Sequence, residues 1–296
     1  MQNKHYLYHL TAGITTLIWG TTMVSSKVLL LAGLTPAQIL IYRFGIGYIF
    51  LWILHPHTYR VRSLHDELLF LCIGITGGSL YFLTENTALI YTHATNVSLI
   101  CALSPFIVAM INRLTLREKL PRRFWAGSVV AFAGVAMVIL NGNYILKLNP
   151  AGDLLAFAAI FSWAVYCVLT RQLHVPYNPL YITRNLFFYG MVTMIPYFCF
   201  VEPFRLPWDI IRQPVVWGNL LFLGLVASSL CYVVWTWVMR ELGVVKTNSY
   251  LYISPPVTVA TAFIVLSEQI TTFIVGGTVL ILFGLWIAGR KKTTKS

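Results

Sequence analysis

The stretch 104–118, SPFIVAMINRLTLRE, and the stretch 254–268, SPPVTVATAFIVLSE, begin with the same two residues and end with the same acid. Further landmarks recur at nearly the same offset, since Trp19 and Lys27 are echoed by Trp163 and Arg171, and Gly127 and Gly134 by Gly277 and Gly284. Both copies lie in strongly apolar sequence. The chain therefore reads as two copies of one unit.

Composition places both copies in a membrane. Apolar residues make up 58% of the chain and charged residues 10%, and the mean hydropathy is +0.74. A bilayer core of about 30 Å needs roughly 20 helical residues per crossing. The connections are too short to form a soluble domain, and the first segment reads as a retained helix, not a signal peptide. Ten crossings are predicted, at 7–31, 35–55, 67–91, 94–116, 122–141, 152–173, 179–201, 215–239, 245–266 and 271–290.

Duplication of a five-crossing unit has a geometric consequence. An odd number of crossings places the second copy upside down relative to the first, which is the symmetry of many secondary transporters. The predicted fold is therefore an all-α integral membrane protein with ten transmembrane helices arranged as two inverted five-helix repeats. The repeats are expected to span residues 1–145 and 146–296.

Basic residues orient this bundle, because short cytoplasmic loops collect Lys and Arg. With both termini in the cytoplasm, fifteen of the 21 basic residues lie on the inner side of a cell inner membrane. The net charge of +12 then faces anionic headgroups of the inner leaflet, and no nucleic acid is needed to explain it. The fifteen are Lys4, Arg60, Arg62, Arg113, Arg117, Lys119, Arg122, Arg123, Arg171, Arg240, Lys246, Arg290, Lys291, Lys292 and Lys295.

Motifs for catalysis or cofactors are missing from the sequence. The five cysteines lie in apolar segments without metal-ligand spacing, and the seven histidines form no metal-binding box. No GxSxG turn, Walker lysine loop or GxGxxG is present. We therefore expect no metal, no cofactor and no enzymatic activity. An integral-membrane enzyme acting on lipid, and a receptor or structural membrane protein without transport activity, remain as alternatives.

Several short motifs together resemble one family. They are Trp19-Gly20, ATNVSLICALSP at 94–105, LREKL at 116–120, Ser254-Pro255 and Ser267-Glu268. Over essentially the whole chain the sequence is similar to the EamA branch of the drug/metabolite transporter superfamily. The resemblance implies five-plus-five inverted repeats, a central cavity lined mainly by helices 1, 3, 4, 6, 8 and 9, and export or exchange of small metabolites.

Glu85 is the most informative intramembrane charge, because an ionisable group in hydrocarbon usually faces a cavity or a partner. Lys27 is predicted at similar depth on the first helix, so a Glu85–Lys27 pair is geometrically reasonable. The pair reads either as a structural salt bridge or as a contact for substrate or proton, and Glu85 is the candidate for proton coupling. In the second repeat Trp235 stands at the position of Glu85.

Helical spacing extends this into a candidate cavity. Polar and aromatic side chains share one face of several predicted helices and would suit a flat or amphipathic solute, although Trp and Tyr also pack helix bundles. The predicted lining residues are Trp19, Thr22, Ser26, Lys27, Tyr81, Glu85, Asn96, Trp163, Tyr166, Tyr232, Trp235, Asn248 and Tyr252.

Other polar or helix-breaking residues are given structural roles. Arg43 and Arg184, in corresponding helices, are expected to bond carbonyls, a carboxylate or cavity water. Pro105 and Pro255 predict matched helix kinks that could serve alternating access. Glu118 and Glu268 read as capping or pairing groups at the following turn, and the repeated glycines predict close helix packing.

These observations favour one function. We expect a monomeric secondary transporter, working as an exporter, that moves small organic metabolites by alternating access through the central cavity. An acid, a base and aromatic rings together fit a zwitterionic amphiphile, so amino acids are a candidate class of substrate.

Overall fold

The computed structural model describes residues 2–57, 61–116, 122–140, 150–173 and 177–289. All regular structure in these residues is helical, which confirms the predicted all-α class. The elements are α1 (Gln2–Leu31), α2 (Pro36–Leu54), α3 (Leu64–Gly74), η1 (Ile75–Ser79), α4 (Leu80–Tyr91), α5 (Ala94–Cys101), α6 (Ser104–Leu116), α7 (Arg122–Leu140), α8 (Pro150–Leu173), α9 (Pro179–Val192), α10 (Ile195–Phe200), α11 (Trp208–Ile211), α12 (Pro214–Leu221), η2 (Phe222–Leu230), α13 (Cys231–Leu242), α14 (Val244–Asn248), η3 (Ser249–Ile253), α15 (Ser254–Leu266) and α16 (Thr272–Gly289).

Seven helical runs in the described residues are long and apolar enough to cross a bilayer, so the chain is a multi-pass membrane protein. Several of them join consecutive elements, as α3, η1 and α4 do in Leu64–Tyr91. Each of the seven overlaps a predicted crossing. The runs are Tyr6–Leu31, Pro36–Leu54, Leu64–Tyr91, Ala94–Thr115, Pro150–Leu173, Pro214–Leu242 and Val244–Leu266.

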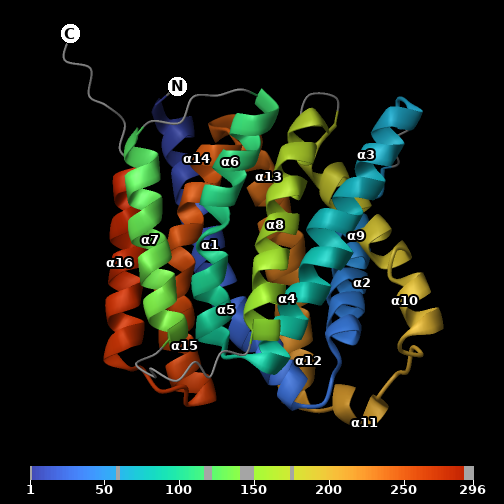
Figure 1. The fold of residues 1–296 in the computed structure, drawn as a ribbon. Helices are drawn as coiled ribbons and strands as arrows, with labels where there is room; N and C mark the ends of the chain where they lie inside the picture. The colour runs from blue at the N-terminus through green and yellow to red at the C-terminus, as the bar shows by residue number, and fades with distance from the viewer. Residues whose placement is uncertain (1, 58–60, 117–121, 141–149, 174–176, 290–296) are drawn as a thin grey trace.

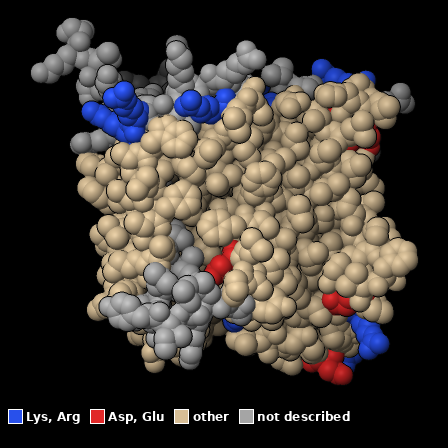
Figure 2. Space-filling view, viewed as in Figure 1, with Lys and Arg blue, Asp and Glu red and all other residues tan. Residues whose placement is uncertain are grey.

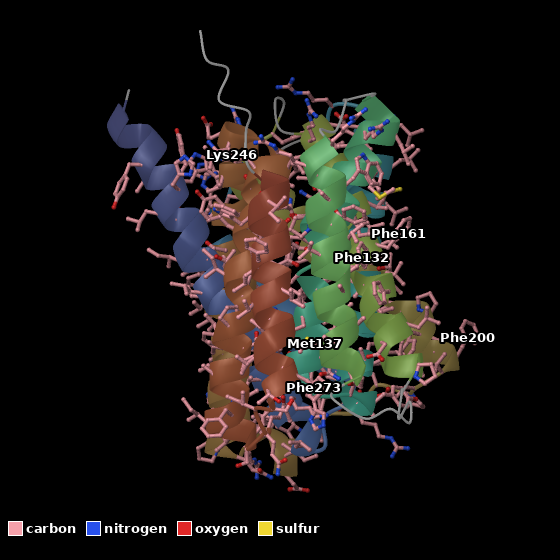
Figure 3. All side chains as sticks on the ribbon, turned by 60° about the vertical axis from the view of Figure 1, so that its left-hand side comes forward. Phe132, Met137, Phe161, Phe200, Lys246 and Phe273 are labelled. Atoms are coloured by element: carbon pink, nitrogen blue, oxygen red, sulfur yellow. The ribbon has the colours of Figure 1, made fainter. Side chains whose placement is uncertain are left out.

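The outer surface of the bundle is apolar. Phe161 on α8 is 59% exposed and Phe200 on α10 is 89% exposed, and both point away from the helices (Figure 3). Figure 2 shows an almost uncharged face between the two ends, with Lys and Arg mainly along the upper edge. Such a surface suits contact with lipid tails. The charged edge lies at the end of the bundle where α1 begins and α16 ends (Figure 1).

The two halves of the chain interlock at the centre. Helix α1 packs on α13 and α15 of the second half, while α8 of the second half packs on α4 and α6 of the first. At the side of the bundle α7 and α16, the last helices of the two halves, form the most extensive pair (Figure 1). Helices α1 and α8, at the centre of the bundle, therefore join the two halves.

Irregular helical turns occur at corresponding places. The wider turns η1 and η2 follow α3 and α12, and corresponding breaks separate α5 from α6 and α14 from α15. Pro105 and Pro255 each stand at the second residue of the helix after the break. A proline there costs no intrahelical hydrogen bond, because the first N–H groups of a helix have no partner. The predicted kink positions thus coincide with helix starts.

Four repeated glycines bring α7 and α16 together. A Cβ on Gly134 would lie 2.6 Å from the carbonyl oxygen of Gly277, and one on Gly284 would collide with the carbonyl oxygen of Gly127. The earlier glycine of one helix faces the later glycine of the other, so the two helices run antiparallel. Met137 of α7 lies against Gly276 between them (Figure 3). Close packing at the repeated glycines is confirmed.

Replacement of Gly134 by Ala should therefore destabilise the protein. The added methyl group has to push apart two backbones, and overpacking of this kind costs about 1–3 kcal/mol. Gly13→Ala is the matched control, because a Cβ at Gly13 meets nothing within 4 Å. Thermal unfolding in detergent should show a lower midpoint for Gly134→Ala only. Equal midpoints for the two variants would contradict the packing argument.

Candidate functional site

A cavity lies among the central helices, with about 590 Å³ of atom-free space including its open part. It draws residues from both halves of the chain. Six of the predicted residues line it: Trp19, Thr22, Tyr81, Glu85, Trp163 and Tyr232. The other lining residues are Met23, Arg43, Phe82, Ser98, Cys101, Ala102, Ser104, Ile160, Leu251 and Ser254.

A cluster of aromatic rings forms one wall of the cavity. Trp19 and Trp163, the repeat-related tryptophans, meet edge to face, with ring centroids 5.6 Å apart and planes at 90°. The ring centroid of Tyr232 lies 5.5 Å from that of Trp19, and the ring centroid of Tyr81 lies 5.4 Å from that of Trp163. The two contacts of Trp19 are edge to face and that of Tyr81 with Trp163 is tilted, and such ring pairs are attractive and restrict ring orientation. The wall is therefore apolar and rigid, with ring edges and faces available to a flat solute.

Hydrogen bonds hold both tryptophans in place. Trp19 Nε1 donates to the carbonyl oxygen of Ala227 at 2.9 Å, and Trp163 Nε1 donates to Asn248 Oδ1 at 2.9 Å. Asn248 is itself buried and donates to the carbonyl of Val244. It therefore supports the cavity wall from behind and does not line it.

Glu85 places a carboxyl group inside the cavity. It lies on α4 and is 3% exposed, and Oε1 accepts a hydrogen bond from the hydroxyl of Tyr81, one turn earlier on the same helix. The spacing of four residues sets this contact, because such residues share a helix face. A buried carboxyl group with a single hydrogen-bond donor in the described part of the chain is poised to bind a proton or a cationic group.

The two intramembrane arginines have different surroundings. Arg184 Nη1 and Nη2 donate to the carbonyls of His55 and His57, at 3.1 and 2.7 Å, and its guanidinium lies 3.9 Å from the ring centre of Trp52. Its expected structural role is confirmed. Arg43 instead lines the cavity.

The expected pair between Glu85 and Lys27 is wrong. Lys27 Nζ donates to the carbonyls of Leu89 and Thr92 at the end of α4, the latter at 3.3 Å. The carbonyl end of a helix carries partial negative charge and attracts cations. Capping of α4 thus takes the ammonium group away from Glu85.

Glu268 caps the helix start next to this point. Its Oε1 accepts from the N–H of Ala94 at 2.9 Å, and its Oε2 accepts from the N–H and hydroxyl of Thr95 at 3.2 and 2.7 Å. His93 Nδ1 lies 3.7 Å from Oε1. Glu268 therefore pairs with the first half of the chain and not with its own following turn, while Glu118 lies outside the described residues.

The hydrogen bonds to Glu268 determine whether its carboxyl group is charged. Burial alone raises the pKa of Glu268, but the donors from His93, Thr95 and the backbone outweigh burial and lower the pKa to about 2. The same carboxylate raises the pKa of His93 above its ordinary value, against burial, which lowers it. The carboxylate of Glu268 therefore stays charged throughout the physiological range.

Besides Lys27, six predicted lining residues lie outside the cavity. Tyr166 and Trp235 are fully buried behind the aromatic wall, with ring centroids 5.0 Å from Trp163 and 4.8 Å from Trp19 respectively. Ser26 is buried on α1, and Asn96 donates to Thr92 Oγ1 at 3.2 Å. Tyr252 packs against a second apolar cluster, and Asn248 supports Trp163 as described above.

Residues around the helix break between α5 and α6 were missed by the sequence reasoning. Ser98, Cys101 and Ser104 line the cavity. Nothing in the sequence distinguishes Cys101 from the other small apolar residues of its segment. The Ser-Pro motif was a usable signal, because irregular backbone at membrane depth is tolerated where it lines a cavity. Across the described ranges, no three His, Cys, Asp or Glu gather in a way that could hold a metal ion.

Comparison with known proteins identifies the family. The sequence model described as "EamA-like transporter family" matches the chain twice, over residues 7–140 and 150–290. The chain belongs to the EamA-like transporter family. The resemblance seen in the sequence motifs is thereby confirmed.

Individual relatives cover much of the chain. An "uncharacterized transporter" of Archaeoglobus fulgidus is 28% identical over 96% of this chain and 98% of its own length. A "probable terminal-alkyne amino-acid exporter" of Streptantibioticus cattleyicolor is 26% identical over 78% of this chain and 76% of its own. A "probable amino-acid metabolite efflux pump" of Salmonella typhimurium is 27% identical over 64% of this chain and 65% of its own length. These names point to transporters and not to enzymes.

A solved structure supports the fold. One crystal structure superimposes on this chain with a TM-score of 0.64, covering 93% of this chain and 97% of its own at 18% sequence identity. At this identity the similarity concerns the fold alone.

The contact between Glu268 and α5 should make stability depend on pH. Because folding lowers the pKa of Glu268, its contribution is present above the ordinary value of 4.5 and is lost as the pH falls toward 2. For His93, whose pKa is raised, the contribution is present below 6.5 and is lost as the pH rises through the folded value. The contact of Glu268 with α5 and His93 therefore stabilises the folded protein most between pH 4.5 and pH 6.5.

Thermal unfolding of Glu268→Gln tests this dependence. The variant should unfold at a lower temperature than the wild type near pH 5.5, and the difference should shrink as the pH is lowered toward about 3. Asp209→Asn, at an exposed acid on α11, is the control and should show no such difference. A gap between wild type and Glu268→Gln that stays constant over this range would refute the assignment.

Proposed function

We propose that the protein is a secondary transporter that exports small organic metabolites, amino acids above all, by alternating access through the central cavity. One observation carries the proposal. An acid, Glu85, and a base, Arg43, line the same buried cavity as Trp19 and Trp163, and the two tryptophans come from different halves of the chain. A membrane-embedded site with both charges and an aromatic wall fits a small dipolar solute that also has an apolar part.

The proposed architecture is two inverted repeats, residues 1–145 and 146–296, with ten crossings. The double match of the family model supports the duplication, and the antiparallel glycine contact of α7 with α16 supports the inversion. Helix α7, helices α9 and α10 together, and α16 would supply the three crossings beyond the seven long apolar runs. Matched helix breaks after Cys101 and before Ser254 would let each half bend at the cavity.

The proposed setting is the cell inner membrane, with both termini in the cytoplasm and the chain acting as a monomer. The basic edge seen in Figure 2 supports the orientation, because it lies where α1 begins and α16 ends. Anionic headgroups of the inner leaflet would attract these positive charges.

Amino acids are proposed as substrates because two lines of support agree. An amino acid carries an ammonium group, a carboxylate and a side chain, and the cavity presents Glu85, Arg43 and aromatic rings. A relative named a probable terminal-alkyne amino-acid exporter aligns with 78% of this chain, and one named a probable amino-acid metabolite efflux pump aligns with 64%.

Counterflow in proteoliposomes tests transport directly. Vesicles containing the purified protein and preloaded with one unlabelled amino acid at a time should transiently accumulate the same labelled amino acid from a dilute external pool. The expected result is accumulation for at least one amino acid with an apolar or aromatic side chain, and none in protein-free vesicles. A complete panel without accumulation would overturn the proposed substrate class.

Glu85 is proposed to couple transport to protons. In its charged form the carboxylate would hold a cationic group of the solute, and protonation would cancel that attraction and release the solute. Glutamine resembles the protonated form. Glu85→Gln should therefore abolish transport driven by a pH gradient and remove the pH dependence of counterflow.

The control for this prediction is Glu241→Gln, at an exposed acid near the end of α13. It should leave both measurements as in the wild type. If Glu85→Gln keeps the wild-type flux and the wild-type response to pH, proton coupling through Glu85 is wrong.

A further inference from the structure

One donor of Arg43 has no partner in the described structure. Arg43 lies on α2 and is 2% exposed. Its Nε donates to Ser228 Oγ at 2.9 Å, and its guanidinium carbon lies 4.0 Å from the ring centre of Phe82. Its Nη1, however, is buried without a hydrogen-bond partner among the described residues. An ionised donor that is buried and unpaired costs free energy, so this arrangement is expected to serve a partner that arrives during function.

Arg184 shows how the same side chain is satisfied when its role is structural. Both of its terminal nitrogens donate to backbone carbonyls, and Trp52 covers its planar face. Arg43 has the aromatic cover, provided by Phe82, and a hydrogen bond at Nε, but its Nη1 finds no acceptor in the residues that the structure describes. Burial alone therefore does not explain the open donor, since the chain can provide acceptors for a buried arginine.

Glu85 does not neutralise Arg43 by direct contact. Both residues line the cavity, yet among the described residues no Arg43–Glu85 contact lies within the 4.0 Å that defines an ion pair. The cavity thus holds one positive and one negative group that remain apart. A solute with both charges can approach both groups, whereas a solute with one charge leaves the other group unpaired.

We infer that Arg43 is the anion-recognising residue of the cavity and that it selects solutes carrying a carboxylate. The planar guanidinium can donate two parallel hydrogen bonds to a carboxylate, which a lysine ammonium cannot reproduce. Glu85 then faces the ammonium group, and the aromatic wall around Trp19 and Trp163 takes the side chain. The inference rests on the proposed transport function and adds the basis of its selectivity.

Three related probes distinguish the contribution of the solute's carboxylate from that of its ammonium group. Phenylalanine has both, phenethylamine lacks the carboxylate, and 3-phenylpropionate lacks the ammonium group. Binding can be followed by intrinsic fluorescence, because Trp19 and Trp163 line the cavity. The wild type should bind phenylalanine about tenfold or more tightly than phenethylamine, the ratio expected when a charge-assisted hydrogen bond is lost.

Variants assign this preference to Arg43. Arg43→Gln should weaken the binding of phenylalanine about tenfold and leave the binding of phenethylamine nearly unchanged. The ratio of the two affinities then approaches one. Arg43→Lys keeps the charge without the planar fork and should restore only part of the ratio. Ser228→Ala removes the partner of Nε and keeps the guanidinium, so it should retain the preference if its thermal unfolding is near that of the wild type.

The outcomes separate this inference from the proposed function. Loss of the preference in Arg43→Gln, with phenethylamine still bound, supports the role of Arg43 and shows that the variant is folded. Phenylalanine bound by the wild type no better than phenethylamine, or an unchanged ratio in Arg43→Gln, overturns the inference and leaves transport intact. Absence of binding for all three probes, together with no counterflow for any amino acid of the full panel, overturns the inference together with amino-acid transport.

Discussion

Charge burial inside an apolar bundle is the constraint on which the rest of this structure depends. Glu85 and Arg43 stand at membrane depth, where an ionised group costs several kcal/mol unless it is paired. Among the described residues each has only partial partners: Tyr81 for Glu85, and Ser228 with Phe82 for Arg43. The helices around them therefore have to provide a rigid cavity whose charged groups a dipolar solute can pair.

The duplicated fold provides such a cavity at its centre. Trp19 and Trp163 hold equivalent positions in the two copies and contact each other there, so the sequence repeat becomes a physical contact between halves. Proline-marked helix starts place irregular backbone beside the same cavity, where its polar groups can be satisfied. At the side of the bundle, the glycines of α7 and α16 remove side-chain volume and let the last helices of the two halves meet.

The helical class, the family and six of the sixteen cavity-lining residues can be predicted from the sequence, because these follow from repetition and from single unusual residues. Trp19 and Trp163 were found as repeat partners, and Glu85 was found as an acid in apolar sequence. The partner of Lys27 was not found, since an apparent depth does not show that carbonyls at the end of α4 lie nearer than a carboxylate. Arg43 and Arg184 looked alike for a related reason: whether a buried arginine meets backbone carbonyls or a cavity depends on the packing of neighbouring helices. Trp235 shares helix α13 with Tyr232, yet only Tyr232 reaches the cavity.

The central claim is that this cavity carries a small dipolar solute across the membrane, and Cys101 offers a direct test. Cys101 lines the cavity at the helix break, and a variant that keeps it while Cys72, Cys167, Cys199 and Cys231 become Ala would have a single thiol there. Its reaction with a small membrane-impermeant thiol reagent can be measured in vesicles of each orientation. Alternating access predicts reaction from both sides of the membrane and slower reaction from both sides when a transported amino acid is present. Reaction from one side only, at a rate that the amino acid does not change, would contradict it.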